Sequence, residues 1–127
     1  MDKNIVITVV LIIFAGLLVW AFQSGVFVPK PITVNVPDGI ILFYGDGCPH
    51  CKIVDDFITE NKIEDKVKFT RLEVWYDKSN QAILGQIAQK CNIETNQVGV
   101  PFLYDGLKKC YVGDVDVINF FKTQAGI

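Results

Sequence analysis

Two cysteines separated by two residues, Cys48 and Cys51, are the side chains of this sequence best suited to chemistry. They follow the apolar run of residues 40–44 and precede a helical pattern, so we expect them at a strand-to-helix turn. Cysteines at this spacing can close a small disulfide ring, and a sulfur at a helix N-terminus lies beside backbone N–H groups that favour its thiolate. The spacing and the position indicate thiol–disulfide exchange.

The two residues between the cysteines, Pro49 and His50, fit the same chemistry. Pro49 suits the first turn of a helix, because the N–H that it lacks would have no helical partner there. His50 is the only histidine of the chain, and its imidazolium form would favour a neighbouring thiolate. Cys51 falls on the apolar stripe of the predicted helix, so we expect it to be the more buried sulfur. Cys48 is then the attacking thiol, and Cys51 resolves the mixed disulfide.

The elements that position this motif follow from the hydrophobic pattern. Strands are predicted at residues 40–44, 67–75, 102–104 and 109–112, and helices at 49–61, from about 79 to 91, and from 114 onward. Ser79 or Asn80 is the expected N-cap of the second helix, and Asp114 that of the last. Strands separated by helices predict an α/β domain whose mixed sheet carries helices on both faces.

The N-terminal segment determines the compartment. Residues 5–22 contain no charge, and as a helix they would rise about 27 Å, close to a bilayer core of roughly 30 Å. The run is longer than the apolar region of most signal peptides, so we expect residues 1–22 to be a membrane anchor, or a signal that is not cleaved. A signal peptide cut after Ala21 is the alternative. Either version exports the rest of the chain to an oxidising exterior.

The remaining organisation is a tether and one domain. Residues 23–38 contain Pro29, Pro31 and Pro37 and are interpreted as the tether, and residues 39–127 as a single folded domain. The predicted location is therefore the cell membrane, with a single pass and the C-terminal domain on the extracytoplasmic side. The net charge of −2 presents no basic face, so nucleic acid is not an expected partner.

Three motifs give the chain a family resemblance. They are Phe43-Tyr44-Gly45-Asp46-Gly47 running into Cys48-Pro49-His50-Cys51-Lys52, then Gly99-Val100-Pro101 before a hairpin, and Val112-Gly113-Asp114 before the last helix. Over residues 39–124 the chain resembles the thioredoxin superfamily. The order of elements is similar to that of glutaredoxins, and the Cys-Pro-His-Cys tetrad is similar to that of DsbA-type oxidants.

The resemblance implies a thioredoxin-like fold with a central mixed four-stranded sheet flanked by helices. It implies that Pro101 follows a cis peptide bond and faces the active disulfide, and that the backbone of Gly99 and Val100 pairs with a substrate peptide. The activity implied is that of a protein thiol–disulfide oxidoreductase without a dissociable cofactor. Its partners would be the thiols or disulfides of other proteins, or a redox partner in the membrane.

The chain also departs from the family pattern. Gly47 replaces a tryptophan, and Leu42 stands where thioredoxins carry a buried aspartate. Glu73 is either a replacement for the missing acid or an outward-facing, solvated carboxylate. Glutathione is not an expected substrate, because the paired glycines of glutaredoxins are missing, although Asp114 and Asp116 are similar to their acidic loop. The direction of the reaction, oxidation or reduction of the substrate, stays open.

Cys91 and Cys110 leave three alternatives open: a second disulfide, two buried free thiols, or a redox relay to the first pair. Together with Cys48 and Cys51 they could also supply four zinc ligands, although they lack the usual spacing of a zinc site. The alternative function is accordingly a non-catalytic thioredoxin-like module that binds a metal or docks to a partner.

Overall fold

The computed structural model describes residues 2–23 and 34–127, which belong to two compact units, Met1–Ile32 and Thr33–Ile127. Most of the predicted tether, residues 24–33, lies outside the described residues. Each unit is described by itself.

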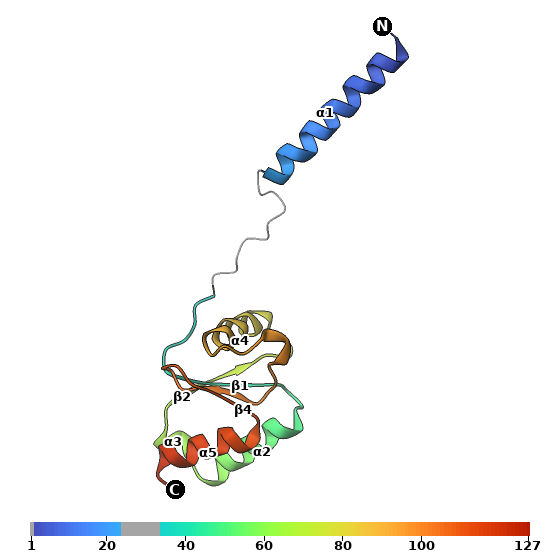
Figure 1. The fold of residues 1–127 in the computed structure, drawn as a ribbon. Coiled ribbons are helices and arrows are strands. Elements are labelled where there is room, and N and C mark those ends of the chain that lie inside the picture. The colour runs from blue at the N-terminus through green and yellow to red at the C-terminus, as the bar shows by residue number, and fades with distance from the viewer. Residues whose placement is uncertain (1, 24–33) are drawn as a thin grey trace. The chain divides into compact units, whose positions relative to one another are not determined.

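The first unit contains one helix, α1 (Lys3–Gln23), which includes all of the predicted segment 5–22 (Figure 1). It has 21 residues, its most apolar 18-residue window has a mean hydropathy of 3.0, and none of its residues is buried within the structure. The helix is long and apolar enough to cross a membrane. This agrees with the prediction of a single-pass anchor.

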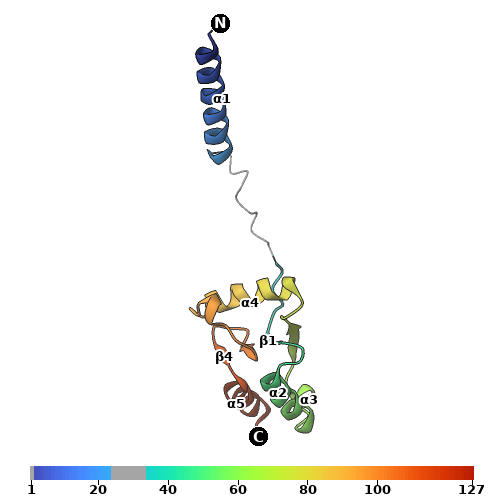
Figure 2. The ribbon, with the colours of Figure 1, turned by 90° about the vertical axis from the view of Figure 1, so that its right-hand side faces the viewer.

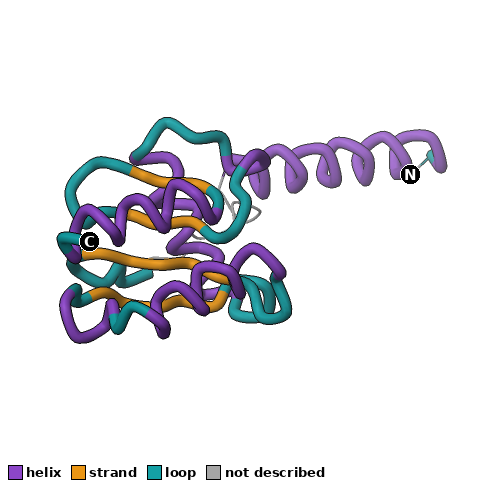
Figure 3. Tube along the Cα trace, turned by 90° about the horizontal axis from the view of Figure 1, so that it is seen from below, coloured by secondary structure: helices purple, strands orange, loops and turns teal. Residues whose placement is uncertain are grey.

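The second unit is built on the mixed four-stranded sheet that the sequence predicts. Its strands are β1 (Ile40–Tyr44), β2 (Phe69–Glu73), β3 (Phe102–Tyr104) and β4 (Cys110–Val112). The strands lie side by side (Figure 3), and their order in the sheet is β2-β1-β3-β4. β1 is parallel to β2 and antiparallel to β3, which is antiparallel to β4. The carboxyl ends of β1 and β2 therefore meet at one edge of the sheet, with Tyr44 opposite Glu73.

Helices cover both faces of this sheet. They are α2 (Pro49–Glu60), α3 (Ile63–Lys66), α4 (Lys78–Lys90) and α5 (Asp114–Ala125), with a short 3₁₀ helix, η1 (Thr95–Gln97), after α4. In Figures 1 and 2, α4 lies on one face, and α2, α3 and α5 lie on the other. The connection β1-α2-β2 is the crossover that two neighbouring parallel strands require.

The alternation of β1 side chains divides the core into two clusters. Leu42 points toward α2 and α5 and packs with Val54, Ile58 and Phe121. Its neighbours Ile41 and Phe43 point to the α4 face and are fully buried. Successive side chains of a strand point to opposite faces of the sheet, so a strand that is covered on both faces needs apolar residues at every position. This explains the continuous apolar run at residues 40–44.

Two helix caps differ from the sequence prediction. Asp77, not Ser79 or Asn80, caps α4, and its carboxylate accepts the N–H of Asn80 at 3.0 Å. Gly113 is the N-cap of α5, and Asp114 is the first residue of the helix. Acidic side chains are favoured in the first turn of a helix as well as at the N-cap, which explains why the sequence pattern indicates Asp114 as the N-cap of α5, one residue after the observed position.

Candidate redox site

A tight turn connects β1 to the cysteine motif. The Cys48 N–H donates to the Gly45 carbonyl at 3.1 Å, which closes a four-residue turn with Gly47 at its third position. Gly47 has a φ of +82°, a conformation that L side chains rarely adopt. The conformation of this turn therefore explains why residue 47 is a glycine.

Cys48 is the N-cap of α2, so the cysteine motif lies at the start of a helix, as predicted. Its Sγ accepts the backbone N–H of Cys51 at 3.2 Å. Pro49 is at the start of the helix, where its missing N–H leaves no unsatisfied donor. The Cys48 sulfur therefore lies at the positive end of the α2 helix dipole.

Cys51 lies on the buried face of α2 together with Val54 and Ile58. The prediction that it is the more buried sulfur is wrong, because Cys48 is 7% exposed and Cys51 8% exposed. The pKa of the Cys51 thiol is raised to about 12, mainly by burial and next by the interaction with Cys48. Cys51 is therefore a thiol at neutral pH, which agrees with a resolving and not an attacking role.

The loop before β3 covers the first cysteine. The Val100–Pro101 peptide bond is cis, and the thiol of Cys48 lies 3.8 Å from the Val100 carbonyl oxygen, toward which it can donate. Pro101 is buried, and its carbonyl accepts the N–H of Gly113 at 2.9 Å. These contacts bring Val100, Pro101 and the start of α5 to the same place as the cysteine motif, and they explain why Cys48 is as buried as Cys51.

His50 extends from the first turn of α2 toward the first turn of α5. Its Nδ1 lies 3.4 Å from Oδ2 of Asp114, and its side chain is 68% exposed. The interaction with His50 is the main cause that lowers the pKa of the Asp114 carboxyl. Asp114 is thus paired with the protein's own imidazole. The acidic first turn of α5 has a local partner beside the cysteine motif, an arrangement that the sequence prediction did not include.

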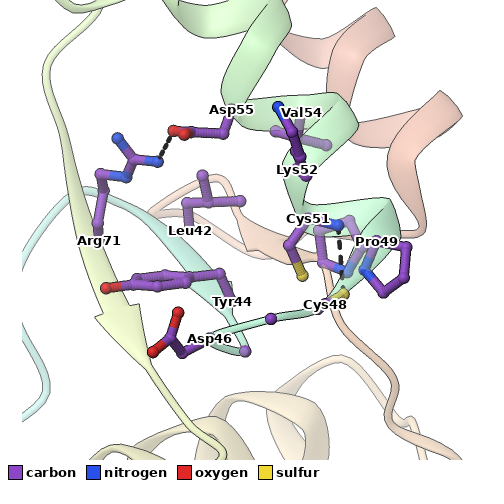
Figure 4. A pocket seen from close by; sticks show the side chains of 13 residues that line it. Leu42, Tyr44, Asp46, Cys48, Pro49, Cys51, Lys52, Val54, Asp55 and Arg71 are labelled. Atoms are coloured by element: carbon purple, nitrogen blue, oxygen red, sulfur yellow. Dashed lines mark hydrogen bonds and ion pairs between the residues drawn. The ribbon is translucent and has the colours of Figure 1, made fainter.

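A pocket of about 590 Å³ adjoins both sulfurs, between α2 and the end of the sheet near β2. Figure 4 shows Cys48 and Cys51 along one side and the ion pair of Arg71 with Asp55 across from them. Leu42 and Tyr44 lie between, and the guanidinium of Arg71 is 5.8 Å from the centre of the Tyr44 ring. The pocket is large enough for a small molecule or several waters.

Glu73 is not a buried acid beneath the cysteine pair. Its carboxylate lies at the end of β2 and accepts four backbone N–H groups. They belong to Asp46 (3.2 Å), Trp75 (2.7 Å), Tyr76 (3.0 Å) and Asp77 (3.2 Å). Desolvation opposes the charge, but these bonds prevail and lower the pKa of the Glu73 carboxyl. Glu73 is a carboxylate that organises two loops, one of which leads into the cysteine motif.

Trp75 is a residue near the site that the sequence analysis missed. It is 47% exposed, and its indole lies against the backbone of Gly45, where a Cβ atom would collide with the ring. Trp75 also lines a second groove of about 470 Å³, together with Val98, Gly99 and Val100. No signal in the sequence pointed to this role, because Trp75 falls at the end of the predicted strand 67–75 and its exposure is visible only in the structure.

Cys91 and Cys110 form a disulfide in the structure, which is the first of the three alternatives. It joins the C-cap of α4 to the first residue of β4, with the Cα atoms 6.1 Å apart and a sequence separation of 19. Cys48 and Cys51 are free. The four sulfurs are therefore two separate pairs, and within residues 2–23 and 34–127 no group of three or more His, Cys, Asp or Glu side chains could hold a metal ion.

The chain was compared with known proteins. No protein-family model, no curated protein and no solved structure matches it.

Proposed function

We propose that this chain is a membrane-tethered thiol–disulfide oxidoreductase with a thioredoxin-like domain, in which Cys48 and Cys51 form the redox pair. The observation that carries the proposal is the position of Cys48. Its sulfur caps α2, accepts the Cys51 N–H at 3.2 Å, and lies 3.8 Å from the carbonyl of Val100, next to the cis bond of Pro101. A sulfur at the N-terminus of a helix, separated from a second cysteine by two residues, is an arrangement suited to thiol–disulfide exchange.

The reaction consists of two exchanges. In the direction that reduces a substrate, the Cys48 thiolate attacks a substrate disulfide, forms a mixed disulfide and releases one substrate thiolate. Cys51 then loses its proton and attacks the Cys48 sulfur, which closes the protein disulfide and releases the second substrate thiolate. Two electrons pass from the protein dithiol to the substrate disulfide, and the released thiolates take up two protons. The reverse sequence oxidises a substrate dithiol.

The second exchange needs a base, because burial raises the pKa of Cys51 to about 12. The pocket beside both sulfurs is large enough to hold water, and water there could carry the proton away from Cys51. Leu42 offers no proton acceptor, and the carboxylate of Glu73 is engaged with backbone N–H groups. We therefore assign the proton transfer to water within the pocket, whose lining also includes the carboxylate of Asp46.

The proposed partners are proteins that contact the loop beside Cys48. The loop of Gly99 and Val100 is the candidate contact for an extended peptide, and α1 would keep the domain close to other membrane proteins. We place the domain on the extracytoplasmic side, where the Cys91–Cys110 disulfide can persist. Its substrates would be the thiols or disulfides of exported proteins, or a redox protein of the same membrane.

The proposal is tested with the full chain in detergent micelles. We expect the wild-type protein to reduce insulin in the presence of dithiothreitol, or to reactivate a scrambled disulfide protein. Cys48→Ser should abolish both activities. Cys51→Ser should accumulate a mixed disulfide, because the attacking thiol is intact and the resolving thiol is missing. Full activity of Cys48→Ser, or stoichiometric zinc that must be removed before either thiol reacts, would support the alternative of a metal-binding or docking module.

A further inference from the structure

Glu73 lies where the two loops at the active end of the sheet meet. It is the last residue of β2 and stands opposite Tyr44, the last residue of β1. The turn that leads to Cys48 follows β1, and the loop that carries Trp75 follows β2. A side chain at this place can act on both loops at once.

The carboxylate bonds to both loops. Oε1 accepts the N–H of Asp46 at 3.2 Å and that of Trp75 at 2.7 Å, and Oε2 accepts those of Tyr76 and Asp77. The backbone carbonyl of Glu73 also accepts the side-chain amide of Asn80 at 2.9 Å. Hydrogen bonds to a charged acceptor are stronger than neutral ones, so this carboxylate holds the two loops in a fixed relation.

A packing contact joins the same two loops. The indole of Trp75 lies on the backbone of Gly45 so closely that no side chain fits between them. Trp75 is held from both sides, since its N–H donates to Glu73 and its carbonyl accepts the side-chain amide of Gln81 at 3.3 Å. The turn of residues 45–48 is therefore hydrogen-bonded to Glu73 through the N–H of Asp46 and is covered by the indole of Trp75 at Gly45.

The turn determines where the Cys48 sulfur lies. The N–H of Cys48 is bonded to the carbonyl of Gly45, and Sγ reaches the N–H of Cys51 only while Cys48 keeps its N-cap conformation. We infer that Glu73 is a positioning residue for the attacking thiol: by holding the turn 45–48 it keeps the Cys48 sulfur on the Cys51 N–H and beside Val100. This inference rests on the proposed role of Cys48 as the nucleophile.

The structure also provides a matched control. Asp105 organises a loop in the same manner, since its Oδ1 accepts the N–H groups of Leu107, Lys108 and Lys109 at 2.8, 2.9 and 3.0 Å. This hairpin connects β3 to β4 at the end of the sheet away from the cysteines, because β3 is antiparallel to β1. Asp105→Asn should weaken the fold locally without reaching Cys48.

The test measures the alkylation of Cys48 by iodoacetamide at pH 7 in the reduced full chain in detergent, followed by mass spectrometry of the Cys48 peptide. We expect Glu73→Gln to slow the reaction by roughly threefold or more, and Asp105→Asn to leave it unchanged. The loss of a nearby negative charge alone would favour the thiolate and speed the reaction, so the direction of the change separates positioning from charge. An unchanged or faster Glu73→Gln variant, or equal slowing by Asp105→Asn, would overturn the inference.

A second pair of variants covers the case in which Glu73→Gln does not fold. Asp46→Pro removes the single N–H that Glu73 accepts from the turn, at a position where proline is favoured, and Asp46→Asn makes the same change of charge but keeps the N–H. Only Asp46→Pro should slow Cys48, and equal rates for the two variants would contradict the inference. If the wild-type Cys48 itself reacts no faster than an ordinary thiol, the proposed function fails first.

Discussion

The contact between Gly45 and Trp75 gives a prediction whose size follows from the structure. A Cβ on residue 45 would lie 2.6 Å from Nε1 of Trp75 and still closer to the ring-fusion carbons Cδ2 and Cε2. An ordinary carbon contact is about 3.5–4.0 Å, so the indole must move by roughly 1 Å or more. The backbone bonds to Glu73 and Gln81 restrict that movement.

We expect Gly45→Ala to destabilise the domain by about 1–3 kcal/mol, the usual cost of overpacking. The measurement is urea unfolding of the full chain in detergent, followed by circular dichroism. The control is Gly85→Ala in α4, where the new Cβ would meet only Cγ2 of Thr95 at 3.9 Å. That change should stabilise the helix by up to about 1 kcal/mol, because alanine is a better helix former than glycine.

A double-mutant cycle shows whether the indole is the cause. In a Trp75→Ala background the space above Gly45 is empty, so adding Gly45→Ala should then cost less than about 0.5 kcal/mol. If Gly45→Ala is as stable as the wild type, or if it costs the same with and without Trp75, the packing argument for this loop is wrong.

Three further predictions concern the disulfide and the titrating groups. Replacing Cys91 and Cys110 by serine opens a loop with a sequence separation of 19 and should destabilise the domain by about 3 kcal/mol on the chain-entropy model. The expected fall in Tm is about 10 °C or more. A Tm within about 2–3 °C of the wild type, which corresponds to less than about 1 kcal/mol, would contradict this prediction. Because His50 lowers the pKa of the Asp114 carboxyl, the carboxylate stabilises the fold above the unfolded pKa, and this stabilisation is lost as the pH falls through the folded pKa. The difference in Tm between the wild type and Asp114→Asn should therefore shrink below about pH 4. A difference that stays constant with pH would argue against the pairing of Asp114 with His50. The pKa of the Cys51 thiol is raised, so its contribution to stability changes with pH in the opposite direction: it is complete below the unfolded thiol pKa and is lost as the pH rises toward about 12. The reduced wild type should therefore lose more stability above about pH 9 than Cys51→Ala does. Equal losses of stability in the two proteins would refute the burial argument.

The elements of the domain could be predicted because local pattern and tertiary environment agree there. The apolar run Ile40–Tyr44 is a strand over the predicted range, since β1 is covered on both faces. Helix α2 starts at Pro49 because cap and proline signals coincide. The short elements α3 and η1 were missed, because four and three residues carry too little periodicity to be recognised.

The contacts of the site were less accessible to prediction, because they join segments far apart in the sequence. The equal burial of Cys48 and Cys51 depends on Val100, 52 residues after Cys48, whereas the sequence pattern reports only the faces of α2. The role of Glu73 depends on an N–H group 27 residues away. The N-cap Asp77 is different, since aspartate is a favoured cap and its position three residues before Asn80 was a signal that could have been used.

The measurement that tests the central claim most directly is a redox titration of the full chain in detergent, with alkylation of free thiols and mass spectrometry of each cysteine peptide. We predict that Cys48 and Cys51 convert together between dithiol and disulfide, with a single midpoint between about −270 and −120 mV, while Cys91 and Cys110 stay bonded over that range. Two cysteines that stay thiols at every potential, or that titrate independently of each other, would contradict the assignment of Cys48 and Cys51 as a redox pair.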